Sequence, residues 1–221
     1  MKRFECGAVL FDLDGVLVDS TRYIEDQWRR WAQSRGLTPE PFLRVCHGRR
    51  ALETIRLAAP HLDAEAEIAA FVPESADPGA MEPIDGAARL LRDLPTGTWA
   101  VATSGTRKTA TGRLCAAGLP LPGVLVCAED VARGKPAPDV YLMAAAKLGM
   151  PPGECLVVED APAGIQAARG AGMRVLALTT NHSRAELDAD ARASSLAAVH
   201  LGRIDRTPTG KPLLELLVVD S

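Results

Sequence analysis

The chain has no Cys-x-x-Cys pair, although five cysteines are scattered along its 221 residues. They are Cys6, Cys46, Cys115, Cys127 and Cys155. Closely spaced cysteines are typical of zinc sites and of the disulfide frameworks of secreted domains, so this pattern fits neither. Isolated cysteines are usually buried packing residues. Because disulfide frameworks are typical of oxidising compartments, their absence from this pattern predicts a protein of the reducing cytoplasm.

Clusters of positive charge and long apolar runs are absent as well. The formal net charge is −3, and no basic group is denser than the pairs Arg29-Arg30 and Arg49-Arg50. A nucleic-acid-binding surface needs a basic patch, so no nucleic-acid partner is expected. No apolar run reaches the length that crosses a bilayer, and acidic residues interrupt the stretch after the basic start. These features argue against a membrane partner and a signal peptide.

What the chain does contain is a series of short apolar runs of four or so residues. They are continuous rather than alternating, as in strands that are buried on both faces of a sheet. The runs are Ala8–Phe11, Trp99–Ala102, Val124–Cys127, Leu156–Val158 and Val175–Leu178. Between them, apolar residues recur at spacings of three and four, which predicts helices over 87–94, 141–148 and 165–171. This alternation predicts an α/β fold with a doubly wound, Rossmann-like parallel sheet.

Residues 16–83 interrupt this alternation, because we find no convincing strand pattern in them. Apolar residues recur at helical spacing over 24–32, 52–59 and 68–71, and the stretch 73–83 has the proline and glycine content of a linker. We therefore expect a catalytic core of residues 1–15 and 84–221 with a helical cap domain, 16–83, inserted after the first strand. Such an insertion lies over the carboxyl ends of the strands, where open α/β sheets bind ligands. The tail, 208–219, is expected to form a turn and an edge strand.

Four groups of polar residues each follow a predicted strand. Asp12 and Asp14 follow the first strand, and Thr103–Gly105 follows the second. Lys135 lies in a loop after the third, and Glu159-Asp160 ends the fourth. Because parallel strands bring their carboxyl ends to one edge of the sheet, we expect these groups to converge.

Such a cluster has chemical consequences. Four carboxylates against one lysine leave an excess of negative charge, and oxygen ligands without histidine or cysteine favour Mg²⁺. Mg²⁺ and Lys135 together can hold a phosphoryl group. One aspartate can then attack phosphorus to form an aspartyl-phosphate, and the second can protonate the leaving oxygen and later activate water. The residues thus predict magnesium-dependent phosphoryl transfer on a small-molecule phosphate monoester.

The stretches FDLDGVLVDS, VATSGT, RGKPAPDVY and VVEDAPAG together resemble the four motifs of the haloacid dehalogenase superfamily. The similarity covers nearly the whole chain and is closest to the small sugar- and polyol-phosphate phosphatases with a helical cap. It implies hydrolysis of such a phosphate with Mg²⁺ through an aspartyl-phosphate. It also implies that Thr103 binds the transferring phosphoryl group, with Ser104 and Gly105 offering backbone amides.

The same resemblance implies roles for the charged residues. Asp12 corresponds to the nucleophile and is also a metal ligand. Asp14 corresponds to the general acid/base, and its backbone carbonyl binds the metal. Lys135 stabilises charge, while Asp160 binds the metal directly or through water and Glu159 assists.

The cap is expected to hold the leaving group of the substrate. His47, Gly48, Arg49 and Arg50 stand at the start of an apparent helix. In the phosphatases that the chain resembles, a His-Gly at this place faces the active site. We expect His47 and one of the two arginines to contact substrate hydroxyls.

Other reactions of the superfamily can be compared with these residues. Dehalogenases lack the second aspartate, so Asp14 argues against dehalogenation. Phosphonatases need a cap lysine, and residues 16–83 contain none. Hexose phosphomutases share the D-x-D motif and the helical cap but carry Lys-Gly where this chain has His47-Gly48. That reaction stays an alternative to hydrolysis.

Proteins outside the superfamily fit less well. A phospho-accepting signalling receiver has its acidic residues in a different order and has no cap. A dinucleotide-binding domain fits no better, because no G-x-G-x-x-G follows the first strand. By analogy with capped phosphatases, in which the cap must move, a monomer is expected.

Overall fold

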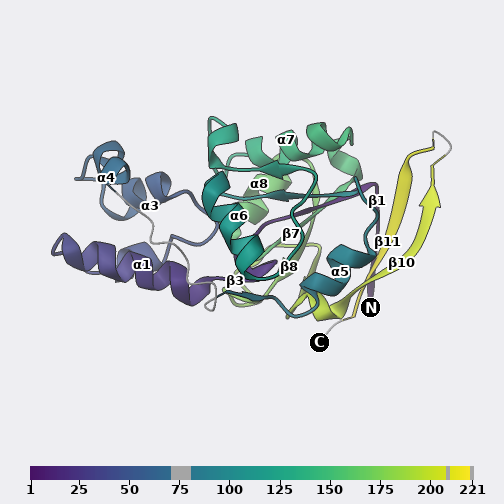
Figure 1. The fold of residues 1–221 in the computed structure, drawn as a ribbon, viewed down its shortest axis with the longest axis horizontal. Helices are drawn as coiled ribbons and strands as arrows, with labels where there is room; N and C mark the ends of the chain where they lie inside the picture. The colour runs from purple at the N-terminus through teal and green to yellow at the C-terminus, as the bar shows by residue number, and fades with distance from the viewer. Residues whose placement is uncertain (71–80, 208–209, 220–221) are drawn as a thin grey trace.

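A parallel six-stranded sheet forms the centre of the molecule (Figure 1). A computed structural model describes residues 1–70, 81–207 and 210–219. The strand order is β6-β5-β2-β7-β8-β9, and every neighbouring pair is parallel. The strands are β2 (Ala8–Phe11), β5 (Trp99–Ala102), β6 (Leu125–Val126), β7 (Cys155–Glu159), β8 (Arg174–Leu178) and β9 (Ala191–Ala193). The expected doubly wound sheet is confirmed, and only β9 was not predicted among its strands.

Helices cover both faces of this sheet. They are α5 (Ala87–Asp93), α6 (Arg107–Ala116), α7 (Asp139–Leu148) and α8 (Pro162–Gly170), joined by short 3₁₀ turns at η2 (Ala128–Asp130), η3 (Pro152–Glu154) and η4 (Leu196–Ala198). On β2, Val9 and Phe11 pack with α5 and α6, whereas Ala8 and Leu10 pack with α7 and α8. Alternate side chains of a strand point to opposite faces, so both must be apolar, which explains the continuous apolar runs.

A second, three-stranded antiparallel sheet lies at the end of the core away from the cap helices (Figure 1). Its order is β1 (Lys2–Cys6), β11 (Pro212–Val218) and β10 (Val199–Arg206). The expectation of an edge strand in the tail was wrong in position, because β11 is the central strand of this sheet. β11 alternates buried and half-buried residues and adds Leu214, Leu216 and Val218 to the core.

Four helices form a separate group beyond the carboxyl edge of the sheet (Figure 1): α1 (Thr21–Ser34), α2 (Glu40–Leu43), α3 (Ala51–Ala58) and α4 (Ala64–Ala70). We call them the cap helices. Their apolar faces meet in a small cluster in which Trp28 stacks on Phe42 at 5.6 Å between ring centroids, with Trp31 edge-on to both. This cluster explains why apolar residues recur at helical spacing over 24–32. Phe71 and residues 73–80 of the predicted linker lie outside the described residues.

The expectation that residues 16–83 contain no strand was wrong at both ends of the segment. β3 (Val18–Asp19) pairs antiparallel with β4 (Glu82–Pro83), so the two connections to the cap helices run side by side. Two residues carry no measurable periodicity, which is why sequence patterns miss such strands. Within the described ranges, no helix combines the length and the apolar character that crossing a bilayer requires.

Two glycines with left-handed backbone provide a matched test of packing. Gly86, just before α5, has φ +87°, and an added Cβ would lie 2.3 Å from the backbone N of Ala197. Gly97 has φ +81°, but no other described atom lies within 4 Å of its added Cβ. We expect Gly97→Ala to lower the free energy of unfolding by about 1 kcal/mol, the cost of the left-handed conformation alone. Gly86→Ala should cost at least about 3 kcal/mol because backbone must also move. Urea denaturation measures both, and equal losses would contradict the structure.

Candidate active site

The groups expected to converge meet at the carboxyl edge of the six-stranded sheet. β5, β2 and β7 are neighbours, so Thr103, Asp12 and Glu159-Asp160 lie close together at their ends. Lys135 reaches the same point from the loop between η2 and α7, and all of these side chains are buried. The Thr103 hydroxyl accepts a hydrogen bond from the amide of Gly105 at 3.0 Å, which shapes the turn after β5.

Lys135 is the electrostatic centre of the site. Its Nζ lies 2.8 Å from Asp12 Oδ1 and 2.7 Å from Glu159 Oε1. The hydroxyl of Tyr141, on α7, donates to the same Glu159 oxygen at 2.8 Å, and the Lys135 ammonium lies 4.9 Å from the Tyr141 ring centroid. Sequence reasoning treated Tyr141 only as an apolar position of a helix.

The second oxygen of Glu159 is also in use. Oε2 accepts hydrogen bonds from the backbone amides of Asp160 and Ala161 at 2.9 and 3.0 Å. A Cβ at Gly164, on the first turns of α8, would lie 1.6 Å from Glu159 Oε1. The glycine of the APAG stretch therefore leaves space for this carboxylate, which is held in place to orient Lys135.

Burial and charge shift the pKa values of these groups. Burial raises the pKa of Asp12 to about 7, although the neighbouring Lys135 opposes the shift. Burial alone would lower the pKa of Lys135, but the carboxylates of Asp12 and Glu159 outweigh it and raise that pKa. Burial, followed by the charges of Glu159 and Asp12, raises the pKa of Asp160 well above its usual range. The cluster thus carries more negative charge than one lysine offsets.

The acidic cluster has the composition of a divalent-cation site. Carboxylate oxygens of Asp12, Glu159 and Asp160 lie within 4.8 Å of one another. Asp160 Oδ1 is buried and has no hydrogen-bond partner among the described residues, whereas Glu159 is fully hydrogen-bonded. A buried oxygen without a donor is costly unless a cation or proton meets it. The donor set fits a hard cation bound by Asp12 and Asp160.

Asp14 belongs to a different set of contacts, facing the cap helices. Its Oδ1 accepts a hydrogen bond from Ser20 Oγ at 2.6 Å and lies 2.5 Å from Arg113 Nη1. Arg113, on α6, is buried, and its guanidinium lies 5.7 Å from the ring centroid of Tyr23 on α1. Neither Ser20 nor Arg113 was predicted. A lone arginine in a helix gives no signal, since its contact with Asp14 joins residues far apart in the chain.

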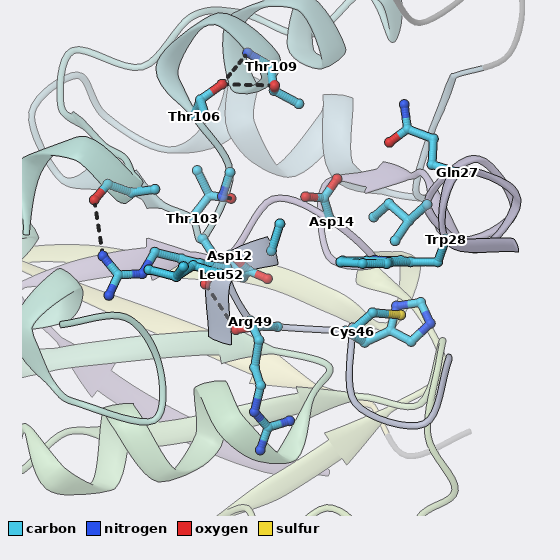
Figure 2. A pocket seen from close by; sticks show the side chains of 18 of the residues that line it. Asp12, Asp14, Gln27, Trp28, Cys46, Arg49, Leu52, Thr103, Thr106 and Thr109 are labelled. Carbon is cyan, nitrogen blue, oxygen red and sulfur yellow. Dashed lines mark hydrogen bonds between the residues drawn. The ribbon is translucent and has the colours of Figure 1, made fainter. Parts of the chain in front are cut away.

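A cavity of about 400 Å³ lies between the cap helices and the edge of the sheet (Figure 2). Asp12, Asp14 and Thr103 line it on the core side. On the cap side, the apolar lining residues include Ile24, Trp28, Leu52 and Ile68, and Gln27 and His47 are polar. On the core side, Thr106, Thr109 and Arg113 add polar groups from the start and the body of α6. This volume is in the range of small-molecule sites.

His47 and Gly48 lie where the cap helices meet the core. His47 Nε2 is 3.6 Å from Glu25 Oε1, and burial lowers the pKa of His47, which favours the neutral ring. The carbonyl of Gly48 accepts a hydrogen bond from Ser104 Oγ at 2.9 Å. A Cβ on Gly48, whose φ is +74°, would lie 2.7 Å from the Cβ of Ala161. Glycine at this position therefore allows the cap to approach the core closely.

The two arginines that follow point to different partners. Arg50 pairs with Glu53 and donates hydrogen bonds to carbonyls of the core segment before Lys135. Those acceptors are Ala128, Val131 and Ala132, at 3.5, 3.3 and 3.2 Å. Arg49 donates to the carbonyl of Val45 at 3.3 Å, and in Figure 2 its guanidinium points away from Asp12 and Asp14. Both residues line the cavity, but Arg50 is the one that joins cap to core.

Comparisons with known proteins agree with this geometry. Residues 6–172 match the family described as haloacid dehalogenase-like hydrolase. The chain belongs to this family. The resemblance read from its motifs is confirmed, and so is the expectation that it is a hydrolase.

Relatives of this haloacid dehalogenase-like hydrolase include two phosphatases. Hexitol phosphatase A of Escherichia coli (strain K12) is 44% identical over 78% of this chain and 83% of its own. Validoxylamine A 7'-phosphate phosphatase of Streptomyces hygroscopicus subsp. limoneus is 39% identical over 87% of this chain and 97% of its own. Among solved structures, a hydrolase from Pseudomonas syringae superposes with a TM-score of 0.75 at 27% identity, covering 86% of this chain and 94% of its own.

The loop after β8 brings further residues to the site of this hydrolase. Asn181 Nδ2 donates to Asp160 Oδ2 at 2.6 Å, and His182 Nδ1 lies 3.1 Å from the Asp160 carbonyl oxygen. The ring of His182 is edge-on to that of His47, with centroids 6.2 Å apart. This loop was not predicted to contribute. It follows a predicted strand, as the other site residues do, and that position is the signal that could have found it.

The raised pKa of Asp12 predicts how the metal-free protein responds to pH. Because the folded-state pKa of about 7 exceeds the ordinary value of 3.8, the stability from this group is present at low pH and is lost as pH rises through 7. Asp12→Asn removes the charge and therefore this loss. With chelator present, we expect the variant to unfold with a free energy at least about 1 kcal/mol above wild type at pH 8, and with a smaller gain at pH 5. Urea denaturation at the two pH values measures this, and a pH-independent difference would contradict it.

Proposed function

We propose that the chain is a Mg²⁺-dependent phosphatase that hydrolyses a small sugar or polyol phosphate through an aspartyl-phosphate on Asp12. One observation carries the proposal. Asp12 is buried at the end of β2 in contact with Lys135, and it lines, with Asp14, a cavity of substrate size. Family membership supports a hydrolytic reaction.

The first step is transfer of the phosphoryl group to Asp12. A carboxylate oxygen of Asp12 forms a bond to phosphorus while the bond from phosphorus to the leaving oxygen breaks. Lys135 and the Thr103 hydroxyl hold phosphoryl oxygens, with amides of Ser104 and Gly105 beside them. Asp14 donates a proton to the leaving alkoxide, which completes release of the alcohol.

The second step is hydrolysis of the aspartyl-phosphate. Asp14, now ionised, takes a proton from a water molecule whose oxygen attacks phosphorus, and the bond to Asp12 breaks to release phosphate. Dehalogenation needs no proton for its leaving group, so the presence of Asp14 supports phosphate ester chemistry.

Mg²⁺ is the cation that we propose for the acidic cluster. Asp12, Asp160 and the backbone carbonyl of Asp14 would hold it, and Glu159 would act by orienting Lys135. When bound, Mg²⁺ supplies positive charge that offsets the negative charge of the phosphoryl group and the carboxylates.

The cavity supports a polyhydroxylated leaving group. Its apolar wall, including Trp28, can pack against the carbon chain or ring of a sugar or polyol, while Gln27, Thr106 and Thr109 can bond hydroxyls. Two relatives, a hexitol phosphatase and a phosphatase of a validoxylamine phosphate, support the same class. Among the cap residues, we propose that His47 contacts substrate and that Arg50 holds the cap against the core.

The proposal extends to the division into domains, the oligomeric state and the cellular compartment. We propose that residues 16–83 form a cap that closes over a core of 1–15 and 84–221, and that the protein works as a monomer because closure is a motion within one chain. All five cysteines are free, which supports a reducing, cytoplasmic setting.

Phosphate release across a panel of hexitol, hexose and glycerol phosphates tests the function. Wild type with Mg²⁺ should release phosphate from at least one of them, and chelator should abolish release. Asp12→Asn should lower kcat by at least about 10³-fold because the nucleophile is lost. Conversion of a hexose 1-phosphate to its 6-phosphate without phosphate release would establish a phosphomutase in place of a phosphatase.

Arg49 and Arg50 provide a paired test of the cap. Arg50→Met removes the hydrogen bonds to the core carbonyls, so kcat/KM should fall about 10-fold or more on every substrate, including p-nitrophenyl phosphate. Arg49→Met is the matched control and should leave p-nitrophenyl phosphate hydrolysis within about 2-fold of wild type. Steady-state kinetics measure both. Equal losses in the two variants would contradict a special role of Arg50 in holding the cap. A loss in Arg50→Met that is restricted to polyol phosphates would instead indicate that Arg50 contacts the substrate.

A further inference from the structure

The chain's single asparagine stands between the candidate metal site and the first cap helix. The side-chain amide of Asn181 donates from Nδ2 to Asp160 Oδ2 at 2.6 Å. Its Oδ1 accepts a hydrogen bond from the hydroxyl of Thr21, the first residue of α1, also at 2.6 Å. Asn181 thus bridges two elements that are distant in the sequence, one carrying a cation ligand and the other starting the cap.

We propose that Asn181 is a positioning residue that orients the Asp160 carboxylate for the divalent cation, and that Thr21 fixes the amide of Asn181 in the orientation this requires. The inference rests on the proposed function, because it assumes that the acidic cluster holds a cation.

The hydrogen bonds on Asp160 carry the first part of the argument. Asn181 occupies Oδ2, whereas Oδ1 is buried without a partner among the described residues. A carboxylate with a donor on one oxygen has its plane fixed, so the other oxygen keeps a defined direction. Partners of this kind around metal ligands typically change metal affinity 10- to 100-fold when they are removed.

The orientation of the amide carries the second part. A carboxylate can only accept, so the NH₂ group of Asn181 must face Asp160 and the carbonyl must face away. Thr21 supplies the donor that this carbonyl needs. With an acceptor in place of that hydroxyl, the amide would gain no stabilisation in this orientation.

Close packing around the pair limits other arrangements. An added Cβ at Gly15, whose φ is +76°, would lie 2.3 Å from Asp160 Oδ2 and 2.4 Å from Asn181 Nδ2. The hydroxyl of Thr180 donates to the Gly15 carbonyl at 2.7 Å and ties the same loop to the chain after β2. The turn that follows Asp14 therefore packs directly against the hydrogen bond between Asn181 and Asp160.

Direct binding of Mn²⁺, used as a spectroscopic substitute for Mg²⁺, tests the inference without relying on turnover. Free Mn²⁺ is measured by electron paramagnetic resonance during titration of wild type and Asn181→Ala. We expect the dissociation constant to rise about 10- to 100-fold in the variant. A dissociation constant within 2-fold of wild type, or a lower one, would overturn the proposal.

Two threonine variants complete the design. Thr21→Val keeps both Asn181 and Asp160 and removes only the hydroxyl that orients the amide, so it should weaken Mn²⁺ binding about 2- to 10-fold. If thermal unfolding in chelator shows that Asn181→Ala does not fold, the Mn²⁺ affinity of Thr21→Val decides whether the Asn181 amide orients Asp160. Thr179→Val is the control, because that hydroxyl bonds the Ala193 carbonyl at 3.4 Å and not the Asn181 pair; Mn²⁺ affinity should stay within 2-fold. Unchanged binding in Thr21→Val would show that the hydroxyl does not orient the amide.

The two levels of the proposal fail in different ways. Wild-type protein that binds no Mn²⁺ would overturn the cation site itself and the inference with it. Wild type that binds Mn²⁺ and releases phosphate, together with normal Mn²⁺ binding in Asn181→Ala, would overturn only the role of Asn181.

Discussion

A buried lysine among carboxylates is the constraint on which the rest of this structure depends. Lys135 has no exposed surface, and Asp12 and Glu159 both contact its ammonium group. Buried charges are costly unless they are paired and hydrogen-bonded, so each neighbour must be held in place. Tyr141 and two backbone amides do this for Glu159, and the ends of adjacent parallel strands do it for the aspartates. The sheet therefore holds close together charges that would otherwise repel one another.

Several specific contacts join the cap helices to this edge of the sheet. Gly48 packs against the turn after β7, and Arg50 bonds the segment that leads to Lys135. Asp14 is held from both sides, by Ser20 at the start of the cap segment and by Arg113 from the core. Asp12 is thus held by the core, whereas the contacts of Asp14 come from both layers.

The sequence pattern predicts the parallel sheet and its motif residues well, for physical reasons. Strands buried on both faces must be continuously apolar, and groups at their carboxyl ends must meet, so Asp12 and Lys135 could be placed together in advance. Hydrophobic patterns do not predict strands that are defined by hydrogen-bonded pairing with a neighbour and not by burial. β10 is largely exposed, and β3 and β4 have two residues each, so none of them carries a readable apolar pattern. Such patterns fail also for single long-range contacts, such as that of Arg113 with Asp14 and that of Asn181 with Thr21, which join residues about a hundred or more positions apart.

The pairing of β3 with β4 affects how such a chain can change over generations. Val18 lies opposite Pro83, so the intervening residues leave and re-enter the core at one place. Their number and composition can vary without shifting the register of the six-stranded sheet, since all six of its described strands lie outside this stretch. The residues that contact Lys135 are consequently encoded outside the stretch that encodes the cap helices. The sequence between β3 and β4 can therefore change while Asp12 keeps its contact with Lys135.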